Sequence, residues 1–285
     1  MSQDQRPLRV AVIGAGPAGI YAADLLSRSE AVAEGQVRVS IDIFDRYPAP
    51  FGLIRYGVAP DHPRIKGIVN SLHKIMENPD IRFFGNVEYG ADLSLAQLRE
   101  HYDAVIFATG AFYDASLHIP GIELDGSYGA ADFVAWYDGH PDVPRQWPLR
   151  AKEIAVLGNG NVALDVARVL SKHAEDLLTT EIPENVYAGL KASPVTDVHV
   201  FGRRGPAQMK FTPLELRELA KSRDVDIVLH EEDLQYDDAS RAAIESNNQI
   251  KALIKTIDKW KAEQAERTEH ASGRLHLHFL QSPAE

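Results

Sequence analysis

Two glycine-rich segments carry the residue types that bind diphosphates. They are Gly14-Ala15-Gly16-Pro17-Ala18-Gly19 and Gly158-Asn159-Gly160-Asn161-Val162-Ala163, and each lies between an apolar run and a helix-forming run. In a dinucleotide-binding fold the first glycine permits a tight turn, the second lets the backbone approach the pyrophosphate, and the third allows close packing of helix on strand. The phosphates lie at the helix N-terminus, where free N–H groups and the helix dipole favour anions. The sequence therefore predicts two nucleotide sites.

Charged residues further along the chain distinguish the two sites. Asp45 follows a second apolar strand, somewhat beyond the usual spacing of about 20 residues, and would hydrogen-bond the adenosine ribose hydroxyls. Arg203 and Arg204 stand where an NAD site carries Asp or Glu, and a guanidinium can bind a 2′-phosphate bidentately. We therefore expect FAD at the first site and NADPH, as hydride donor, at the second. The alternatives are glycines that only shape a turn and a solvated loop at Gly202–Gly205.

The strands and helices that must position these residues alternate along the chain. In the N-terminal half the apolar patterns predict strands over 8–13, 37–44 and 81–90, a central strand within 102–110, and helices over 20–28, over 65–76 and after Ser94. In the C-terminal half they predict strands over 154–157, 198–201 and 274–280, a helix from 162 to about 178, and a charged, exposed helix over 250–267. Thr212-Pro213-Leu214-Glu215 has the N-cap, the proline and the acidic residue that begin a further helix.

This alternation predicts an α/β fold with two doubly wound, Rossmann-like domains built on parallel sheets, the first of them incomplete. Residues 1–112 would form the N-terminal half of an FAD-binding domain, and residues 113–285 an NADP-binding domain. The stretch 112–150 is rich in Gly, Pro and aromatic residues, which is typical of a connection between domains.

The composition restricts the chemistry. The chain has no cysteine, which excludes a redox dithiol or a cysteine-ligated cluster within these residues, so redox chemistry needs a bound organic cofactor. The net charge of −11 argues against nucleic-acid binding, and an acidic partner would need a local basic patch. No signal region is evident, and the longest uncharged run, Val10–Ala23, is too short to span a membrane. We expect a cytoplasmic enzyme, with a processed organellar protein as the alternative.

Three long motifs, in order, resemble one family. "PAPFGLIRYGVAPDHPRIK", "GNGNVALDVARVL" and "GRRGPAQMKFTPLELREL" closely resemble segments of the adrenodoxin-reductase-like ferredoxin–NADP reductases. The resemblance runs from about Arg9 to the last residues. It implies a flavin-dependent ferredoxin–NADP(+) reductase with resident FAD, NADPH as hydride donor, and a ferredoxin-like iron–sulfur protein as one-electron acceptor.

For the flavin site, the resemblance assigns Gly14–Gly19 to the phosphate turn, with Ala18 near the pyrophosphate. It places Asp45 at an acidic position that is more often glutamate, and Leu53 and Val87 at flavin-contacting positions.

For the coenzyme site, the resemblance assigns Gly158–Val162 to the NADP phosphate turn, Arg203 and Arg204 to the 2′-phosphate clamp, and Glu215 to a nucleotide contact. Glu215 could equally serve as the reciprocal half of a capping box with Thr212.

His62 and Asp165 match polar positions near the place where flavin and nicotinamide meet, and Glu218 matches a position on the proton or electron path. Each has a structural alternative: His62 could stabilise a turn, Asp165 could favour its helix through the dipole, and Glu218 could be solvated.

Two further features bear on function. His276 and His278 alternate on one strand face, but no carboxylate or cysteine stands at ligand spacing, so no metal site is expected. The family's return to the FAD domain, with its Gly-Trp and Gly-Pro-Thr-Gly segments, is absent, which indicates a fragment with weak or no reductase activity. The alternatives are a non-catalytic nucleotide-binding module or subunit, and the NADPH electron-input half of another flavoenzyme.

Overall fold

The computed structural model describes residues 6–111, 113–115 and 117–284. It divides the chain into two compact units, Met1–Tyr113 and Asp114–Glu285. Residue 112, the end of the expected first domain, lies outside the described residues.

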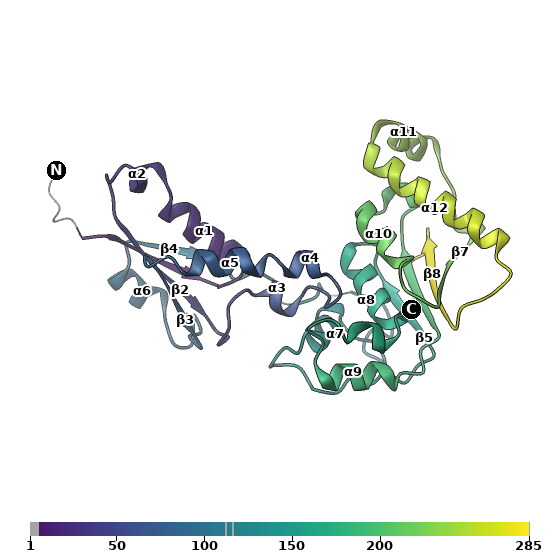
Figure 1. Cartoon of the computed structure of the whole chain (residues 1–285), viewed down its shortest axis with the longest axis horizontal. Helices are drawn as coiled ribbons and strands as arrows, with labels where there is room; N and C mark the ends of the chain where they lie inside the picture. The colour runs from purple at the N-terminus through teal and green to yellow at the C-terminus, as the bar shows by residue number, and fades with distance from the viewer. Residues whose placement is uncertain (1–5, 112, 116, 285) are drawn as a thin grey trace. The chain divides into compact units, whose positions relative to one another are not determined.

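The first unit is built on a parallel four-stranded sheet in the order β3-β2-β1-β4 (Figure 1). Its strands are β1 (Leu8–Ile13), β2 (Val39–Asp45), β3 (Ile81–Gly85) and β4 (Ala104–Phe107). Because all four strands run in one direction, the loops after β1 and β2 meet at one edge of the sheet.

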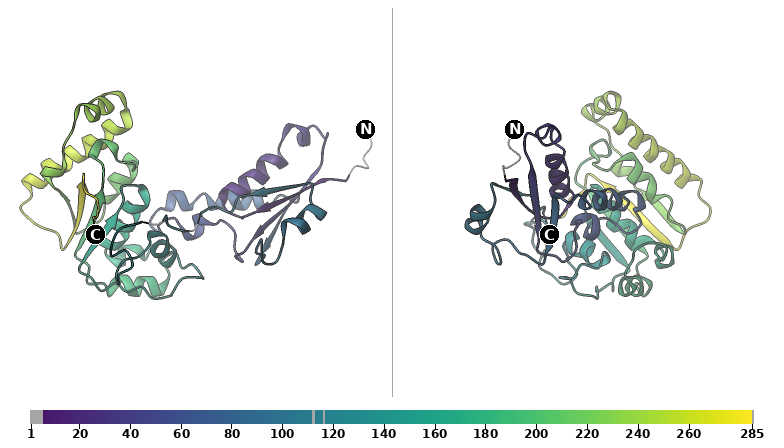
Figure 2. Two further views of the ribbon diagram at one scale, coloured as in Figure 1. Left: turned by 180° about the vertical axis from the view of Figure 1, so that it is seen from behind. Right: turned by 60° about the vertical axis from the view of Figure 1, so that its left-hand side comes forward.

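Helices cover both faces of this sheet (Figures 1 and 2). Helices α1 (Pro17–Ser27) and α5 (Val69–Met76) pack together on one face, and α6 (Leu95–His101) lies on the other. The short helices α2 (Glu30–Ala33), α3 (Leu53–Tyr56) and α4 (Pro63–Lys66) lie in the connections. The sequence predicts a helix after Ser94, and in the structure Ser94 and Gln97 form the capping box that starts α6.

Two expectations for this unit were wrong. Strand β4 is an edge strand of the sheet, not a central one, and Phe107 at its end is 50% exposed. An apolar run predicts a strand but not its place in the sheet order. The stretch 65–76 is also not one helix, because the Ile68 N–H bonds to the Ile65 carbonyl and the Asn70 N–H to that of Gly67, three residues back, which separates α4 from α5.

The second unit contains a second parallel four-stranded sheet, in the order β5-β6-β8-β7. Its strands are β5 (Glu153–Leu157), β6 (Asp197–Gly202), β7 (Val225–Leu229) and β8 (Gly273–Phe279). Two parallel sheets with crossover helices confirm the predicted α/β, Rossmann-like class.

One face of the second sheet is buried under helices. Leu275, Leu277 and Phe279 of β8 are each 1% exposed. The helices of this unit are α7 (Ala130–Tyr137), α8 (Asn161–Ser171), α9 (Glu184–Lys191), α10 (Pro213–Leu219), α11 (Asp238–Ser246) and α12 (Asn248–Glu266), with 3-10 turns over Ala174–Leu177, Pro206–Gln208 and Glu231–Asp233. Helices α8, α10 and α12 contact one another or the strands of this sheet.

The second unit also departs from expectation in two helices. Helix α8 ends at Ser171, because Lys172 leaves the helical conformation with ψ 145° and a 3-10 turn follows. Helix α12 is not exposed all round, since it buries Leu253, Ile257 and Trp260. The many charged residues in its sequence make a narrow stripe of apolar residues at helical spacing hard to recognise.

The opposite face of the second sheet carries polar side chains from alternate positions of β6 and β8, among them Asp197, His199, His276 and His278. Burial lowers the pKa of His276 and that of His278 below the ordinary value for histidine.

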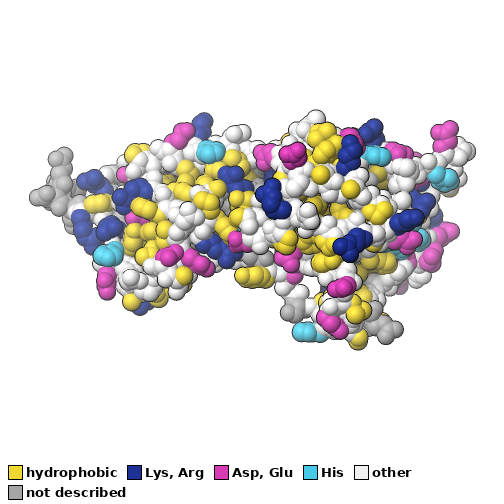
Figure 3. Space-filling view, turned by 90° about the horizontal axis from the view of Figure 1, so that it is seen from below, with side chains coloured by type: hydrophobic (Ala, Val, Ile, Leu, Met, Phe, Trp, Pro, Cys, Tyr) yellow, Lys and Arg dark blue, Asp and Glu magenta, His cyan; other side chains and the backbone are white. Residues whose placement is uncertain are grey.

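Charged and hydrophobic side chains are mixed on the face of the molecule that is seen from below (Figure 3). On the face drawn in Figure 3, acidic and basic side chains lie interspersed among hydrophobic ones. Across the described part of the chain, no helix combines the length and the apolar composition that are needed to cross a bilayer.

Candidate nucleotide-binding sites

The first glycine turn connects β1 to α1 and has no room for side chains at two positions. Gly14 has φ +109°, and a Cβ there would lie 2.3 Å from the Ala108 carbonyl oxygen. A Cβ at Gly19 would lie 2.1 Å from the Gly14 carbonyl oxygen, because α1 packs directly on the turn. These are the two roles, tight turn and close packing, that the spacing predicts for the first and third glycines.

The N-terminus of α1 is open to an anion. Gly16 is its N-cap and Pro17 its first residue, and no side chain of the described residues caps it. The first intrahelical bond joins the Ile20 N–H to the Gly16 carbonyl, so the N–H groups of Ala18 and Gly19 precede the helical ladder. Ala18 is exposed. A helix start with this geometry fits a phosphate group.

Asp45 is already part of this turn. One of its carboxylate oxygens accepts a hydrogen bond from the Ala15 N–H (2.7 Å), and the other accepts one from the Tyr47 N–H (3.0 Å). An ionised carboxylate can accept about four hydrogen bonds, so both oxygens keep capacity for ribose hydroxyls. The residue predicted to bind ribose therefore also holds the phosphate turn in shape.

The other predicted residues of the first unit lie in different surroundings. Leu53 begins α3 and is 46% exposed, directly after Gly52, which approaches Gly16 of the phosphate turn. Val87 packs against the hydrophobic cluster beneath α6, and its N–H bonds to the Asp45 carbonyl (3.0 Å). His62 is buried at the start of α4, where its carbonyl accepts the Ile65 N–H (3.1 Å).

The second glycine turn connects β5 to α8 in the same manner. Gly158 has φ +145°, and its N–H bonds to the Phe201 carbonyl at the end of β6 (2.9 Å). Gly160 is the N-cap of α8, and no described side chain caps it. A Cβ at Gly160 would meet nothing within 4 Å, and Asn161 and Val162 in the first turn are exposed. This helix start has open space in front of it, which fits a diphosphate.

A neighbouring segment braces the second turn. The Asn161 side-chain oxygen accepts a hydrogen bond from the Thr212 N–H (3.1 Å), and the Asn159 carbonyl accepts one from the Lys210 N–H (3.1 Å). The sequence identifies Asn161 only as part of the glycine segment. Its contact with the start of α10 could not be inferred, because no local pattern indicates which loops meet.

Arg203 and Arg204 lie directly after β6, the strand beside β5. Both are exposed, and neither guanidinium has an ion-pair partner among the residues that the structure describes. The adjacent Gly202 contacts the Asn159 side chain, so both arginines follow a strand end that touches the second glycine turn. Two unpaired cations beside an open helix N-terminus fit a phosphorylated ribose.

The acidic residues predicted for the second unit all have helical positions. Glu215 is buried in the first turn of α10, where its N–H bonds to the Thr212 hydroxyl (3.2 Å), the first half of the predicted capping box. Asp165 pairs with the buried Arg168 on α8 (3.0 Å). Glu218 pairs with Lys221 (2.6 Å) and is 29% exposed.

Comparison with known proteins agrees with this architecture. The family model described as "Pyridine nucleotide-disulphide oxidoreductase" matches residues 8–256. The chain belongs to this family. The predicted resemblance to the adrenodoxin-reductase-like group is also confirmed, because identity of about 40% extends over nearly the whole chain.

Three relatives illustrate this similarity. The chain is 40% identical over 281 residues to the mitochondrial NADPH:adrenodoxin oxidoreductase of Arabidopsis thaliana, covering 98% of this chain and 57% of that protein. It is 41% identical over 282 residues to NADPH-ferredoxin reductase FprA of Mycobacterium tuberculosis (strain H37Rv), covering 98% and 60%. The structure of Mycobacterium tuberculosis FprA in complex with NADPH matches with a TM-score of 0.90 at 40% identity, covering 98% of this chain and 61% of that one. The chain thus spans about three-fifths of the length of these relatives.

Proposed function

We propose that this chain holds NADPH and FAD within a flavin-dependent oxidoreductase that passes electrons from NADPH to a ferredoxin-type iron–sulfur protein. The observation that carries the proposal is the second turn, where a helix start that no described side chain caps lies beside two exposed arginines. The names of the relatives, an NADPH:adrenodoxin oxidoreductase and an NADPH-ferredoxin reductase, support the same reaction.

Each unit contributes a distinct set of residues. In the first, the start of α1 would bind the FAD pyrophosphate and Asp45 the adenosine ribose. Leu53 and Val87 are proposed flavin contacts, and the exposure of Leu53 beside the turn supports its part. The chemistry supplied by FAD, when bound, is to take up a hydride and to release electrons singly.

In the second unit, the start of α8 would bind the NADPH pyrophosphate, and Arg203 and Arg204 its 2′-phosphate. Glu215 is a proposed nucleotide contact. The chain has no cysteine, so these residues hold neither a dithiol nor a cysteine-ligated cluster. Single electrons would therefore leave to a separate iron–sulfur protein.

His62, Asp165 and Glu218 are proposed polar residues of the reaction path. The burial of His62 and the low exposure of Asp165, 14%, support a defined position for each. The surface pair of Glu218 with Lys221 is equally suited to stabilising α10. We also propose a cytoplasmic location, which the sequence predicts.

A second candidate function is nucleotide binding without flavin reduction. It is favoured by the exposed edge of the first sheet, where Phe107 of β4 contacts Tyr89 and remains half exposed. An open sheet edge beside the flavin turn would leave the isoalloxazine ring with little protein around it.

The test is a visible absorption spectrum of the purified 285-residue chain after incubation with FAD and gel filtration. The proposal expects retained flavin absorption, bleaching by NADPH under anaerobic conditions, and reduction of added ferredoxin. A colourless protein that binds NADPH would support the second candidate and contradict the first. Bleaching with reduction of small organic acceptors but not of ferredoxin would instead indicate the NADPH electron-input half of another flavoenzyme.

A further inference from the structure

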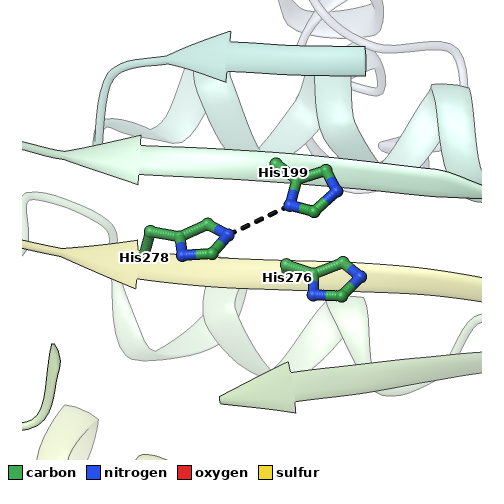
Figure 4. Close-up of side chains that lie close together, drawn as sticks. All are labelled: His199, His276 and His278. Carbon is green, nitrogen blue, oxygen red and sulfur yellow. Dashed lines mark hydrogen bonds between the residues drawn. The ribbon is translucent and has the colours of Figure 1, made fainter. Parts of the chain in front are cut away.

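Histidine side chains from three segments gather on the polar face of the second sheet. His199 lies on β6, His276 and His278 lie on β8, and His230 directly follows β7. The parallel register pairs His199 with His276, which puts their rings on the same face. Figure 4 shows His199, His276 and His278 side by side.

The ring nitrogens of these residues approach one another closely. His199 Nδ1 lies 3.0 Å from His278 Nε2, and His230 Nε2 lies 3.3 Å from His276 Nδ1. One nitrogen from each of His199, His276 and His278 lies within 4.8 Å of the other two. Two nitrogens bound to one tetrahedral zinc ion are roughly 3.3 Å apart, given Zn–N bonds of about 2.0–2.1 Å. The nitrogens of His199 and His278, 3.0 Å apart, are already near that separation.

Carboxylates lie beside the outer nitrogens of two of these rings. His276 Nε2 lies 3.0 Å from an Asp197 carboxylate oxygen, and His278 Nδ1 lies 3.3 Å from one of Asp233. The Asp197 carboxylate therefore accepts a hydrogen bond from His276 Nε2 and leaves Nδ1 of that ring directed at His230, whereas the Asp233 carboxylate lies beside His278 Nδ1 without hydrogen-bond geometry. Metal-binding histidines are commonly oriented by a carboxylate in this way.

Other residues fix both carboxylates in turn. Arg274 donates to Asp197 (2.7 Å), and Gln281 donates to Asp233 (2.9 Å). The expectation of no metal site rested on the lack of a carboxylate near His276 and His278 in the sequence. In the structure, Asp197 and Asp233 lie beside these histidines although they come from distant segments.

We propose that His199, His276 and His278 bind a divalent transition metal ion, with His230 beside them as a further nitrogen donor. An all-imidazole set suits Zn²⁺, Cu²⁺ or Ni²⁺ and disfavours Mg²⁺ or Ca²⁺. The His276 and His278 side chains are 12% and 11% exposed, so an ion can reach them from solvent. The rings of His199 and His276 stack at 4.1 Å, so the His276 ring must turn to complete the set. The ion would link β6 to β8 on this face.

The test is titration of the tag-free, metal-free chain with Co²⁺, followed by displacement with Zn²⁺. We expect one Co²⁺ per chain, with the visible bands of a nitrogen-coordinated ion, and loss of those bands when Zn²⁺ is added. His276→Gln and His278→Gln should each weaken Zn²⁺ binding by more than about 100-fold. Asp197→Asn should weaken it by about 10–100-fold, since it removes the orienting carboxylate but none of the three imidazoles.

The matched control is His101→Gln, which removes an exposed histidine of α6 in the first unit and should leave the affinity for Zn²⁺ unchanged. Thermal unfolding without metal checks that each variant folds, and if one does not, the Co²⁺ spectrum of the unaltered chain decides. Absence of nitrogen-coordinated Co²⁺ bands, or an affinity for Zn²⁺ unaffected by both histidine substitutions, would overturn the proposal. NADPH binding, measured in parallel, tests the nucleotide sites separately.

Discussion

The carboxylate of Asp45 accepts a hydrogen bond from the backbone N–H of Ala15 at 2.7 Å, so the end of β2 holds the glycine turn that follows β1. A second bond, from the Tyr47 N–H, fixes the same carboxylate. Asp45 therefore shapes the turn whether or not a ribose is bound to it.

We predict that Asp45→Asn destabilises the first unit and weakens FAD binding. The amide has one acceptor oxygen, so one of the two N–H groups loses its bond, at a cost of about 1–3 kcal/mol in the free energy of unfolding. Urea unfolding and flavin fluorescence measure the two effects. The control is Glu88→Gln, an exposed carboxylate of the same unit. Unchanged stability in Asp45→Asn would show that the turn does not depend on this carboxylate.

Replacing Arg203 and Arg204 together by alanine should weaken NADPH binding much more than NADH binding. Each charge-assisted hydrogen bond to the 2′-phosphate contributes about 1.5–3 kcal/mol, so the loss of both arginines should lower the ratio of the two affinities by at least about 100-fold. Isothermal titration with both coenzymes gives this ratio. The double variant Arg217→Ala, Lys251→Ala removes two other exposed cations of the same unit and should leave the ratio unchanged. Equal losses of affinity for both coenzymes would show that Arg203 and Arg204 do not bind the 2′-phosphate.

Local patterns predict much of this fold because each dinucleotide motif is local. The strand over 8–13, the glycine turn and the following helix lie next to one another in the sequence, and the structure has them as β1 and α1. The Ser94 cap likewise carries its own signal, since Gln97 stands three residues later.

What local patterns could not predict depends on contacts between distant segments. The edge position of β4 depends on which strands pair with β1. The hydrogen bond from Thr212 to Asn161 depends on which loops lie next to each other. The gathering of His199 with His276 likewise follows from the pairing of β6 with β8. No residue type within a short window determines any of these pairings.

Asn161→Ala should weaken the binding of NADPH and of NADH by similar factors. The Asn161 side chain accepts the Thr212 N–H and so orders the turn before any 2′-phosphate is recognised. Loss of one hydrogen bond of about 1 kcal/mol predicts a roughly fivefold weaker affinity for NADPH and for NADH. Asn161→Asp keeps the acceptor, so its stability should match the unaltered chain, while its added charge should repel the phosphates. A change confined to NADPH would contradict this role.

Asp224 should make stability depend on pH in the acid range. Hydrogen bonds from the Ser272 hydroxyl and N–H lower the pKa of Asp224 to about 2. Because the pKa is lower in the folded state, the charged carboxylate stabilises the fold above its ordinary pKa near 4, and this stabilisation is lost as the pH falls through about 2.

Asp224→Asn tests this dependence, because asparagine tolerates the left-handed backbone (φ 56°), keeps one acceptor oxygen and removes the charge. The variant should be less stable than the unaltered chain at pH 5–7, and the difference should shrink between about pH 4 and pH 2. Urea unfolding over this range measures it, with the exposed Asp125→Asn as a control for one lost acidic group. A difference that is constant with pH would show that the charge is not responsible.

Gly160→Ala and Gly19→Ala should have different effects, because Gly160 leaves room for a ligand whereas Gly19 leaves room for the packing of α1 on its own turn. A Cβ at Gly160 meets nothing within 4 Å, so the fold should keep its stability, but the methyl group would lie where a diphosphate must approach the start of α8. Both NADPH and NADH should therefore bind more weakly.

A Cβ at Gly19 would lie 2.1 Å from the rigid Gly14 carbonyl oxygen, so that variant should lose about 1–3 kcal/mol of stability or more. Thermal unfolding and coenzyme titration of both variants check the contrast. Normal coenzyme affinity in a stable Gly160→Ala variant would place the diphosphate away from this turn.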